Sequence, residues 1–465
     1  TADGSMGPGL GPSCVLAITW DRWTGGTYCV GSYQSNTVLA SAVFGTGWGA
    51  GTWGRGTWDS ASDLTAGGTT LRIWSHDNFG EDLLMNVRNE GIYYWDKTNG
   101  VTTRAVSLAS LGVTANKIPT IAKQILVSDK DRHIIAFGCD AETAIGTQDP
   151  LLIRFGSQES LTDWAATATN TAGDLRIGSG SEIVAAVETR QQILVFTDVS
   201  LHAMQFLGPP FTFGINLISE NITIASPKAA VAVDDAVFWM GSAEFYAFTG
   251  AVQRIPCTVR DYVFDDINTS QSDKIVSGAN VSFSEVWWFY PSADSTENDR
   301  YVVYNYLEKL WFIGNLARTA WLDRGISSLP LAAGTNNFLY NQEVGAQDDG
   351  AAMTSFIESG DMSITEGNQF SFINRVIPDI NFRETVDTSS LDFILETKSF
   401  PGQADQNSST NTVSKTSSTP VDQYTNQYFT RLRGRSFTLK LQSTDANVLW
   451  RLGVPRVDIR PDGKR

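Results

Sequence analysis

A two-stranded β-hairpin theme recurs from about Leu71 to Gln342 and limits what this chain can fold into. Each copy has a short β-branched or aromatic run, a polar turn, and a second run that ends near a glycine. The alternation of apolar and polar residues within these runs is typical of half-buried strands. The clearest copies are "LLMNVRNEGIYYWDKTNG" from Leu83, "ILVFTDVSLHAMQFLG" from Ile193, "AVFWMGSAEFYAFTGAV" from Ala236 and "RYVVYNYLEKLWFIGN" from Arg300.

The spacing of these hairpins indicates a repeated all-β architecture. Repetition at roughly 40 to 50 residues, with two to four strands in each repeat, is typical of a β-propeller. We therefore predict a mainly β fold with a β-propeller body over residues 71–354. The repeats carry no fixed signature of the WD or Asp-box kind, so an irregular β-sandwich stays open as the alternative for this region.

The rest of the chain divides into two further segments. Residues 1–70 are glycine-rich and irregular, begin without Met, and show no signal-peptide pattern or membrane-spanning run. Residues 355–465 form a predicted C-terminal β domain with longer strands, in which residues 401–423 are a polar, low-complexity loop. Helix signals are scarce, and the best is residues 258–268, where Thr258 is placed to cap the start.

A glycine-rich loop in the first segment carries three tryptophans. The stretch "GTGWGAGTWGRGTWDS", residues 45–60, is too rich in glycine for a helix or a regular strand. Exposed indole rings on a surface loop need a partner, either the chain's own core or a neighbouring subunit. We predict the neighbour, because Trp and Arg are favoured anchors at interfaces. The predicted contact residues are Trp48, Trp53, Arg55 and Trp58.

Charge is distributed unevenly along the chain. The net charge is −16, with 37 acidic and 21 basic residues in 1–354 against 3 acidic and 9 basic residues in 431–465. An acidic body argues against tight, sequence-independent binding of nucleic acid. The basic tail is either a solvated surface or a contact with an acidic neighbour, and we predict the contact. Its predicted interface residues are Arg433, Arg435, Arg451, Arg456 and Arg460.

No constellation of catalytic residues stands out. Three histidines, His76, His133 and His202, lie far apart in strand-like runs, and the four cysteines have neither metal-site spacing nor disulfide-scaffold density. The GxGxxG match in residues 49–54 is not followed by a helix, so it is a weak dinucleotide signal. Carboxylates at 234–235 and 261–266 offer pairs of the kind glycosidases use, as any acidic protein does. We predict no enzyme, no metal and no cofactor.

Several long stretches resemble the tail nozzle, or tail tubular B-type, proteins of short-tailed bacteriophages. They are "GWGAGTWGRGTW", "DPLLIRFGSQESLTDW" from Asp149, residues 225–268, "NDRYVVYNYLEKLWFIG" from Asn298, and the ending "WRLGVPRVDIRPDGKR" from Trp450. The resemblance implies a structural protein of the virion tail. It implies a ring of six subunits, each built around a β-propeller, through which the genome leaves the capsid.

The resemblance also implies partners. Adaptor ring proteins would lie above the ring, and other tail proteins or the host surface below it. Genomic DNA would pass through without tight binding, and the acidic composition fits a wall that repels phosphate. Two alternatives stay open: a glycan-binding or glycan-degrading tail propeller, favoured by the 14 tryptophans, and a monomeric scaffold that binds proteins.

Overall fold

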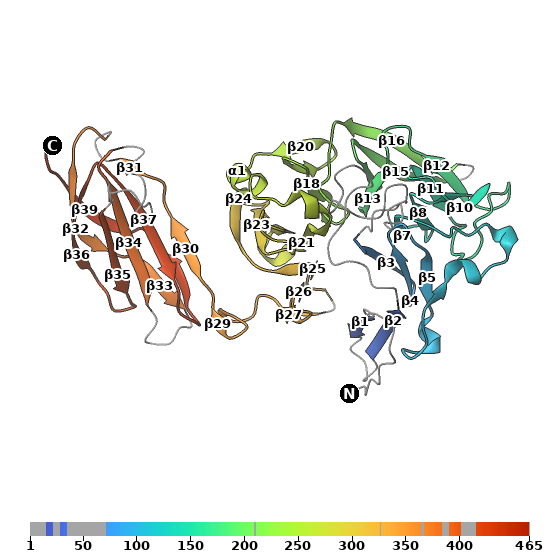
Figure 1. Ribbon diagram of the computed structural model, residues 1–465, viewed down its shortest axis with the longest axis horizontal. Helices are drawn as coiled ribbons and strands as arrows, with labels where there is room; N and C mark the ends of the chain where they lie inside the picture. The colour runs from blue at the N-terminus through green and yellow to red at the C-terminus, as the bar shows by residue number, and fades with distance from the viewer. Residues whose placement is uncertain are drawn as a thin grey trace, which may run out of the picture. The chain divides into compact units, whose positions relative to one another are not determined.

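The computed structural model describes residues 71–208, 211–325, 327–363, 367–383, 390–400 and 415–464, together with the backbone of two strands nearer the N-terminus. Over these residues the chain is mainly β, as the sequence predicts, and is built from antiparallel sheets (Figure 1). Within the described residues, no helix has the length and apolar character that crossing a bilayer requires.

The chain divides into two compact units. The first comprises Thr1–Gln342 and the second Glu343–Arg465, so the division falls earlier than the boundary expected after residue 354. In the sequence, longer strand-like runs begin only after about Gly350, so the expected boundary falls later. The structure places the short strands β28 (Gln347–Asp348) and β29 (Ala351–Ala352) in the second unit.

In its described residues the first unit has six sheets of three or four strands, here called sheets 1 to 6 in chain order. They follow the hairpin β1 (Val15–Asp21) and β2 (Tyr28–Gln34). Sheet 1 is β3 (Trp74–Phe79), β4 (Asp82–Val87), β5 (Ile92–Trp95) and β6 (Val106–Ser107). Sheet 2 is β7 (Gln124–Val127), β8 (Ile134–Phe137), β11 (Leu152–Phe155) and β12 (Gly173–Arg176), with the hairpin β9 (Asp140–Ala141) and β10 (Ala144–Gln148) inserted. Sheet 3 is β13 (Ile183–Glu188), β14 (Ile193–Thr197), β15 (Ser200–Gly208) and β16 (Thr212–Glu220).

The remaining three sheets repeat the same up-and-down order. Sheet 4 is β17 (Ala230–Val233), β18 (Ala236–Met240), β19 (Phe245–Phe248) and β20 (Val252–Ile255). Sheet 5 is β21 (Val276–Asn280), β22 (Glu285–Tyr290), β23 (Arg300–Asn305) and β24 (Leu310–Asn315). Sheet 6 has three strands, β25 (Arg318–Leu322), β26 (Leu331–Gly334) and β27 (Leu339–Asn341). The four hairpins expected from the sequence are confirmed as β4–β5, β14–β15, β18–β19 and β23–β24.

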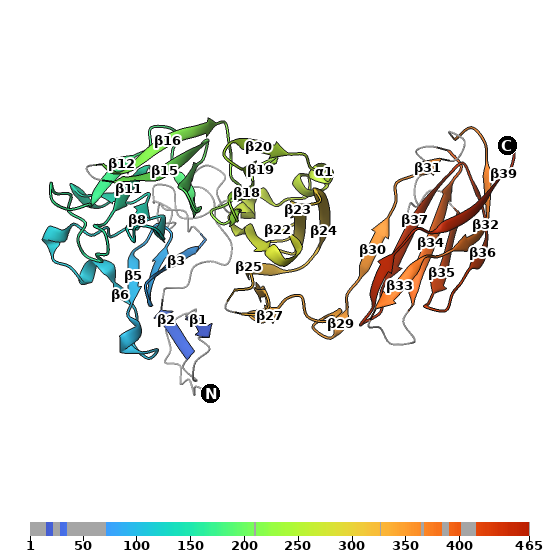
Figure 2. The same ribbon diagram turned by 180° about the vertical axis from the view of Figure 1, so that it is seen from behind.

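The first strands of successive sheets lie beside one another, in the order β3, β7, β13, β17, β21, β25 (Figures 1 and 2). Between the sheets lie apolar cores that take side chains from both neighbours. Trp288 of sheet 5 is fully buried, and its indole nitrogen donates to the carbonyl of Ala229 beside sheet 4 at 2.9 Å. Trp239 of sheet 4 packs edge-on against Phe196 of sheet 3 at 5.1 Å. Aromatic residues in the second strands therefore join one sheet to the next.

One helix forms where the sequence predicts it, but it is shorter. The helix α1 spans Arg260–Phe264 instead of residues 258–268, and its N-cap is Val259, with no capping hydrogen bond from a side chain. Thr258 therefore does not cap it. The chain after α1 turns into a 3₁₀ segment, Thr269–Lys274, where Asn268 caps the start by accepting from the amide of Ser270.

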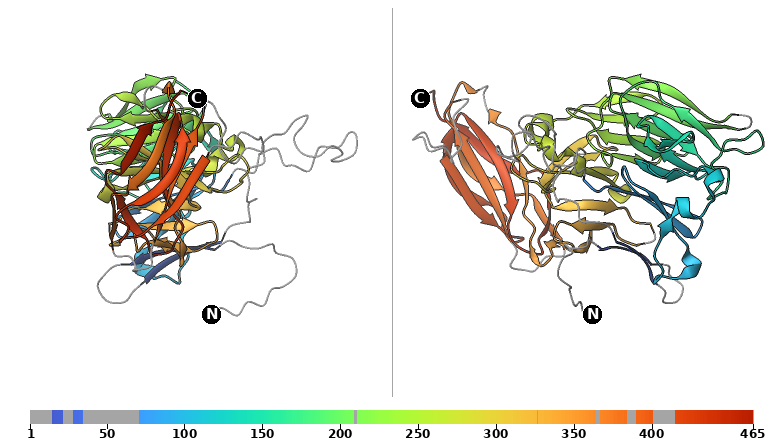
Figure 3. Two further views of the ribbon diagram at one scale, coloured as in Figure 1. Left: turned by 90° about the vertical axis from the view of Figure 1, so that its left-hand side faces the viewer. Right: turned by 45° about the vertical axis from the view of Figure 1, so that its right-hand side comes forward.

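The second unit packs two layers of strands around one core (Figure 3). One layer is β30 (Ser355–Glu358), β31 (Met362–Ser363), β37 (Ser436–Ser443), β34 (Leu391–Lys398) and β35 (Lys415–Val421). The other is β36 (Tyr428–Gly434), β32 (Ser371–Ile377) and β39 (Arg456–Pro461), continued along the chain by the pair β33 (Ile380–Arg383) and β38 (Leu449–Leu452).

Strand β35 corrects one expectation from sequence. Residues 401–423 were expected to form a polar loop, but Lys415–Val421 pairs with residues 391–397 of β34. Threonine favours strands, and Val421 is buried in the core of the unit. Pro420 is tolerated because β35 lies at the edge of its sheet, where one row of amides needs no partner. The polar composition of this stretch did not indicate a strand.

Candidate functional site

The glycine–tryptophan loop lies outside the described residues. Trp48, Trp53, Arg55 and Trp58 are in the part of the chain for which no placement is given. The dinucleotide-like match in residues 49–54 also lies there. The interface prediction for this loop therefore stays a prediction.

Most of the arginines predicted as interface residues share one surface of the second unit. The inner side chains of β32, β36 and β39 pack into the core, and the intervening residues point away from it. The same alternation holds in β33 and β38, where Phe382 and Trp450 pack inward. We call the outward surface the arginine face. Its arginines are Arg375, Arg383, Arg431, Arg433, Arg451, Arg456 and Arg460.

The strand register determines which residues lie next to one another on the arginine face. Phe372 of β32 lies between Arg433 of β36 and Arg460 of β39. Next along the sheet, Arg375 lies between Phe429 and Asp458. Cross-strand neighbours in a sheet are about 5 Å apart at Cβ, so the arginines and the aromatic rings alternate at close spacing. Phe429 is 69% exposed.

Two of the predicted arginines already have partners in their own unit. The guanidinium group of Arg433 stacks over Phe370 at 4.2 Å and pairs with Asp462. Arg435 also stacks over Phe370, at 4.8 Å, and donates to the carbonyl of Gly367 at 3.1 Å. Arg435 lies beyond the end of β36 and is not part of the arginine face. These contacts fix both side chains in place at one end of the sheet.

The other predicted arginines are exposed. Arg460 is 3.8 Å from Asp458, which also lies 4.0 Å from Arg375. Within the described chain, the guanidinium groups of Arg431, Arg451 and Arg456 have neither a carboxylate nor a hydrogen-bond partner. One carboxylate thus serves two arginines while three have none, so the face carries a net positive charge.

The count of bases in residues 431–465 missed Arg375 and Arg383. They come from a different stretch, "SFINRVIPDINFR", in residues 371–383. Pairing of β32 with β36 and β39, and of β33 with β38, brings them to the same surface. The alternation in that stretch indicates a strand with outward arginines, but only the register shows which face they share.

An acidic surface lies in the first unit, where the first strands of sheets 1 to 4 end. We call it the acidic end, and its members are Asp77, Asp129, Asp131, Glu188, Asp234 and Asp235. The amide of Asp129 donates to Glu188 Oε1 at 3.0 Å. Burial raises the pKa of Glu188 to about 7, and the nearby carboxylates of Asp129, Asp77 and Asp131 contribute to the rise. Arg190 is 3.8 Å from a carboxylate oxygen of Asp234 and of Asp235.

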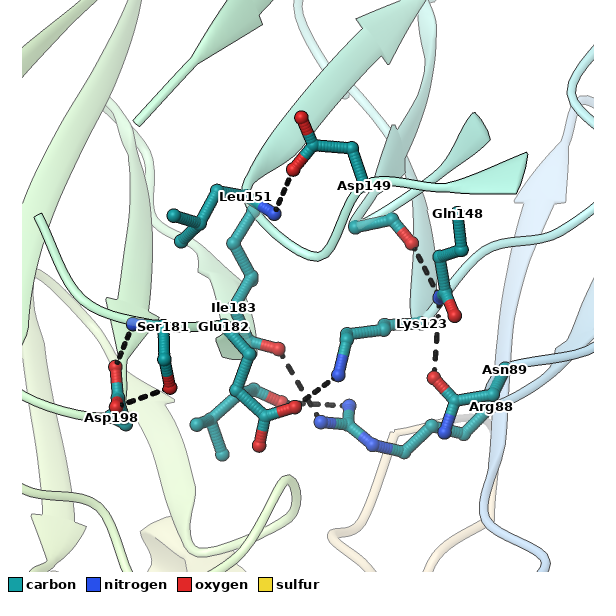
Figure 4. Close-up of polar contacts among 12 residues, drawn as sticks. Arg88, Asn89, Lys123, Gln148, Asp149, Leu151, Ser181, Glu182, Ile183 and Asp198 are labelled. Atoms are coloured by element: carbon teal, nitrogen blue, oxygen red, sulfur yellow. Dashed lines mark hydrogen bonds and ion pairs between the residues drawn. The ribbon is translucent and has the colours of Figure 1, made fainter. Parts of the chain in front are cut away.

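A charged cluster joins the opposite ends of the same first strands (Figure 4). Arg88 of sheet 1 donates to the carbonyls of Val184 and Ile183 in sheet 3, at 2.9 and 3.4 Å. Lys123, immediately before sheet 2, is ion-paired with Glu182, immediately before sheet 3. These contacts tie three sheets together at one end.

Burial dominates the electrostatics of this cluster. It lowers the pKa of Arg88, of Lys123 and of Lys228, and it raises the pKa of Asp273. The charge of Arg88 lowers the pKa of Lys228 further, and it opposes the rise at Asp273. Buried positive and negative groups therefore lie close together and partly offset one another's charge. Their contacts link sheets 1, 2 and 3.

The histidines and the described cysteines have structural surroundings. His133 and His202 are buried in different sheets, and their Nε2 atoms are each 3.1 Å from a hydroxyl, that of Thr171 and that of Ser179. Burial lowers the pKa of both rings and so favours their neutral form. Cys139 and Cys257 are free thiols, as expected, and burial raises the pKa of Cys139 to about 12.

Carboxylates in the stretches that suggested glycosidase pairs have basic partners. Asp266 is ion-paired with Arg300 at 2.6 Å, and Asp261 with Arg260 at 2.9 Å. Asp234 and Asp235 face Arg190 in the acidic end. These pairings give Asp234, Asp235, Asp261 and Asp266 a structural explanation.

Comparison with known proteins gives low similarity. No protein-family model matches the chain, and no curated protein matches its sequence. Among solved structures, the AfRom2 CNH domain is similar at 10% identity and TM-score 0.33, over 63% of this chain and 91% of that chain. The N-terminal domain of Nup159 is similar at 12% identity and TM-score 0.30, over 57% of this chain and 73% of that chain. TM-scores this low do not establish a shared fold, so neither fold nor function is argued from these proteins.

Proposed function

We propose that sheets 1 to 6 are the blades of a β-propeller. The support is the up-and-down strand order of each sheet and the side-by-side arrangement of the six first strands. In a propeller the first strand of each blade lines the axis. On this proposal the charged cluster of Arg88, Lys123, Glu182, Lys228 and Asp273 surrounds one end of the axis, and the acidic end surrounds the other.

We propose that the chain is a subunit of a tail nozzle, the ring through which the genome of a short-tailed bacteriophage leaves the virion. The sequence resemblance carries this proposal. Its quoted stretches follow structural elements: residues 225–268 span sheet 4 and α1, residues 298–314 contain β23 and all of β24 except its last residue, and residues 450–465 contain β39. The chain has two β units, and each carries a charged surface, the acidic end on the first and the arginine face on the second. Such surfaces suit a structural protein that contacts several neighbouring subunits or proteins.

The proposed ring has six copies, with adaptor ring proteins above it and other tail proteins or the host surface below. The first unit holds 34 acidic and 21 basic residues, and the second 16 and 13. A channel wall formed by the first unit would therefore repel phosphate, so that DNA slides past it without the counterion release that accompanies tight binding.

The glycan-binding alternative requires exposed tryptophan rings on which sugars can stack. Every tryptophan among the described residues is buried or half-buried. Trp239 and Trp288 fill the spaces between sheets, and Trp287 stacks on Trp321 at 5.4 Å. Packing thus accounts for these rings, and no described feature favours a glycan-active protein.

Electron microscopy tests the proposal. The purified chain, examined by negative staining, is expected to form closed rings with a central channel. Antibodies raised against it are expected to label the tail tip of the phage that encodes it and to leave the capsid unlabelled. Only single particles at every concentration, together with tails that do not bind the antibody, would contradict the nozzle proposal.

A further inference from the structure

The arginine face has the composition of a protein interface core. All seven of its bases are arginines and none is a lysine. Interfaces are enriched in Arg and aromatic residues and depleted in Lys, whereas a surface kept only for solubility has no preference of this kind. Exposed apolar side chains lie among the arginines: Phe429 in β36 and Val454 in the β38–β39 turn, at 69% and 75% exposed.

The backbone of the arginine face is held in paired strands, and the positive charge of its arginines is only partly neutralised by nearby carboxylates. Its residues project from paired strands, and Arg433 is fixed by Phe370 and Asp462. Only Asp458 offers a carboxylate to the exposed arginines within the described chain. The guanidinium groups without a partner keep their donors free for charge-assisted, bidentate hydrogen bonds to the carboxylates of a partner.

Two kinds of partner supply the matching negative charge: nucleic acid and an acidic protein surface. The chain's own charge favours the protein. With a net charge of −16, the molecule as a whole repels a polyanion at long range. A second copy carries the same net charge, but its excess of carboxylates is concentrated in the first unit, with 34 acids against 21 bases, where they can contact a basic face locally.

The acidic end is the complementary surface that the structure describes best. Asp129, Asp234 and Asp235 are exposed there. Burial raises the pKa of Glu188, and repulsion from the carboxylates of Asp129, Asp77 and Asp131 adds to the rise. Cations from outside the surface would relieve this repulsion, and arginines spaced along a sheet can reach several carboxylates at once.

We propose that the arginine face of one copy binds the acidic end of the first unit of a second copy. The contact joins two different surfaces, so it is heterologous and can continue from copy to copy until a ring closes. The inference rests on the proposed function for the ring itself, and it adds which surfaces meet. The arginine face and the acidic end are the two halves of each subunit contact.

Two charge-reversed variants of the full chain test this pairing. The first is Arg456→Glu with Arg460→Glu, which reverses the arginine face. The second is Asp129→Arg with Asp234→Arg, which reverses the acidic end. Each variant alone is expected to self-associate roughly 30-fold or more weakly than the wild type, because a charge-paired interface loses about 2 kcal/mol or more. Sedimentation velocity measures the masses, and circular dichroism confirms that each variant is folded.

Mixing the two variants is the decisive step. Each retains the surface that the other lacks, and the two reversed surfaces are again opposite in charge, so a 1:1 mixture is expected to regain association, beginning with a mixed dimer. The control is Lys415→Glu, which reverses an exposed charge on the other layer of the second unit and is expected to associate like the wild type. Raising the salt concentration from about 0.05 to 0.5 M is expected to weaken both the wild-type assembly and the mixed dimer.

Several outcomes would overturn the inference. A mixture that stays monomeric would show that the acidic end is not the partner. A wild-type chain that remains single and binds a DNA oligonucleotide through the arginine face would assign that face to nucleic acid. Rings that form and survive both reversals would refute this pairing while leaving the nozzle proposal intact. The absence of any ring, from purified chain and from virion tails, would instead refute the nozzle proposal.

Discussion

Replacing Glu188 by Gln should stabilise the folded protein at pH 8 and leave its stability unchanged at pH 4. The pKa of this carboxyl is about 7 in the folded chain against an ordinary 4.5, because the group is buried and faces other carboxylates. A raised pKa means that the contribution of Glu188 is fully favourable below pH 4.5 and is lost as the pH rises towards 7. Above pH 7 the folded chain therefore contains a carboxylate in unfavourable surroundings.

The size of the effect follows from the shift. At 1.36 kcal/mol per pKa unit, a rise of about 2.5 units corresponds to roughly 3 kcal/mol. The side chain is only half-buried, so solvent screening reduces this to about 1–2 kcal/mol. Glutamine keeps the oxygen that accepts from the amide of Asp129 at 3.0 Å, so the substitution removes the charge and preserves the hydrogen bond.

Urea denaturation followed by tryptophan fluorescence, at pH 4 and at pH 8, measures this difference. The matched control is Glu308→Gln, an exposed residue in the β23–β24 turn, which is expected to change the free energy of unfolding by less than about 0.5 kcal/mol at both pH values. Equal effects of Glu188→Gln at the two pH values, or no gain at pH 8, would refute the argument that burial and the neighbouring carboxylates raise the pKa of Glu188.

Three further predictions concern packing, the charged cluster and assembly. Trp288→Ala should lower the free energy of unfolding by about 3–5 kcal/mol, because it empties a fully buried site between sheets 4 and 5, whereas Phe312→Ala, at 47% exposed, should cost less than about 1 kcal/mol in the same urea assay. Lys123→Met should lower the free energy of unfolding by about 1–3 kcal/mol, because it leaves the partly exposed carboxylate of Glu182 without its partner, whereas Lys123→Met combined with Glu182→Met should cost less than about 1 kcal/mol. A loss in the double variant as large as in the single one would mean that the ion pair itself holds the sheets together. Trp53→Ala combined with Trp58→Ala should impair ring assembly, counted by electron microscopy, while the circular dichroism spectrum is retained; normal assembly would remove the anchor hypothesis.

Sequence patterns predict the sheets of the first unit well because each sheet is made of consecutive strands. A hairpin such as β23–β24 is local in sequence, so its alternation and its turn residues determine it. The boundary at residue 342 and the strand Lys415–Val421 were not predicted. Both depend on pairing with distant segments: β35 is a strand because β34 lies beside it, and no property of "KTSSTPV" alone requires that.

The arginine face follows from the same distinction between local and distant pairing. Counting bases near the C-terminus identifies Arg451, Arg456 and Arg460, but it also includes Arg435, which the structure places beyond the end of β36. It omits Arg375, whose strand begins far earlier in the chain. A one-residue shift in the pairing of β32 would turn Arg375 into the core and expose Val376. The burial of Val376 in the core of the unit excludes that register, so the apolar residues that fill the core also set which charges meet on the opposite side. A surface of this kind is therefore specified by its buried neighbours, and substitutions in the core that shift the register should abolish it even when every arginine is kept.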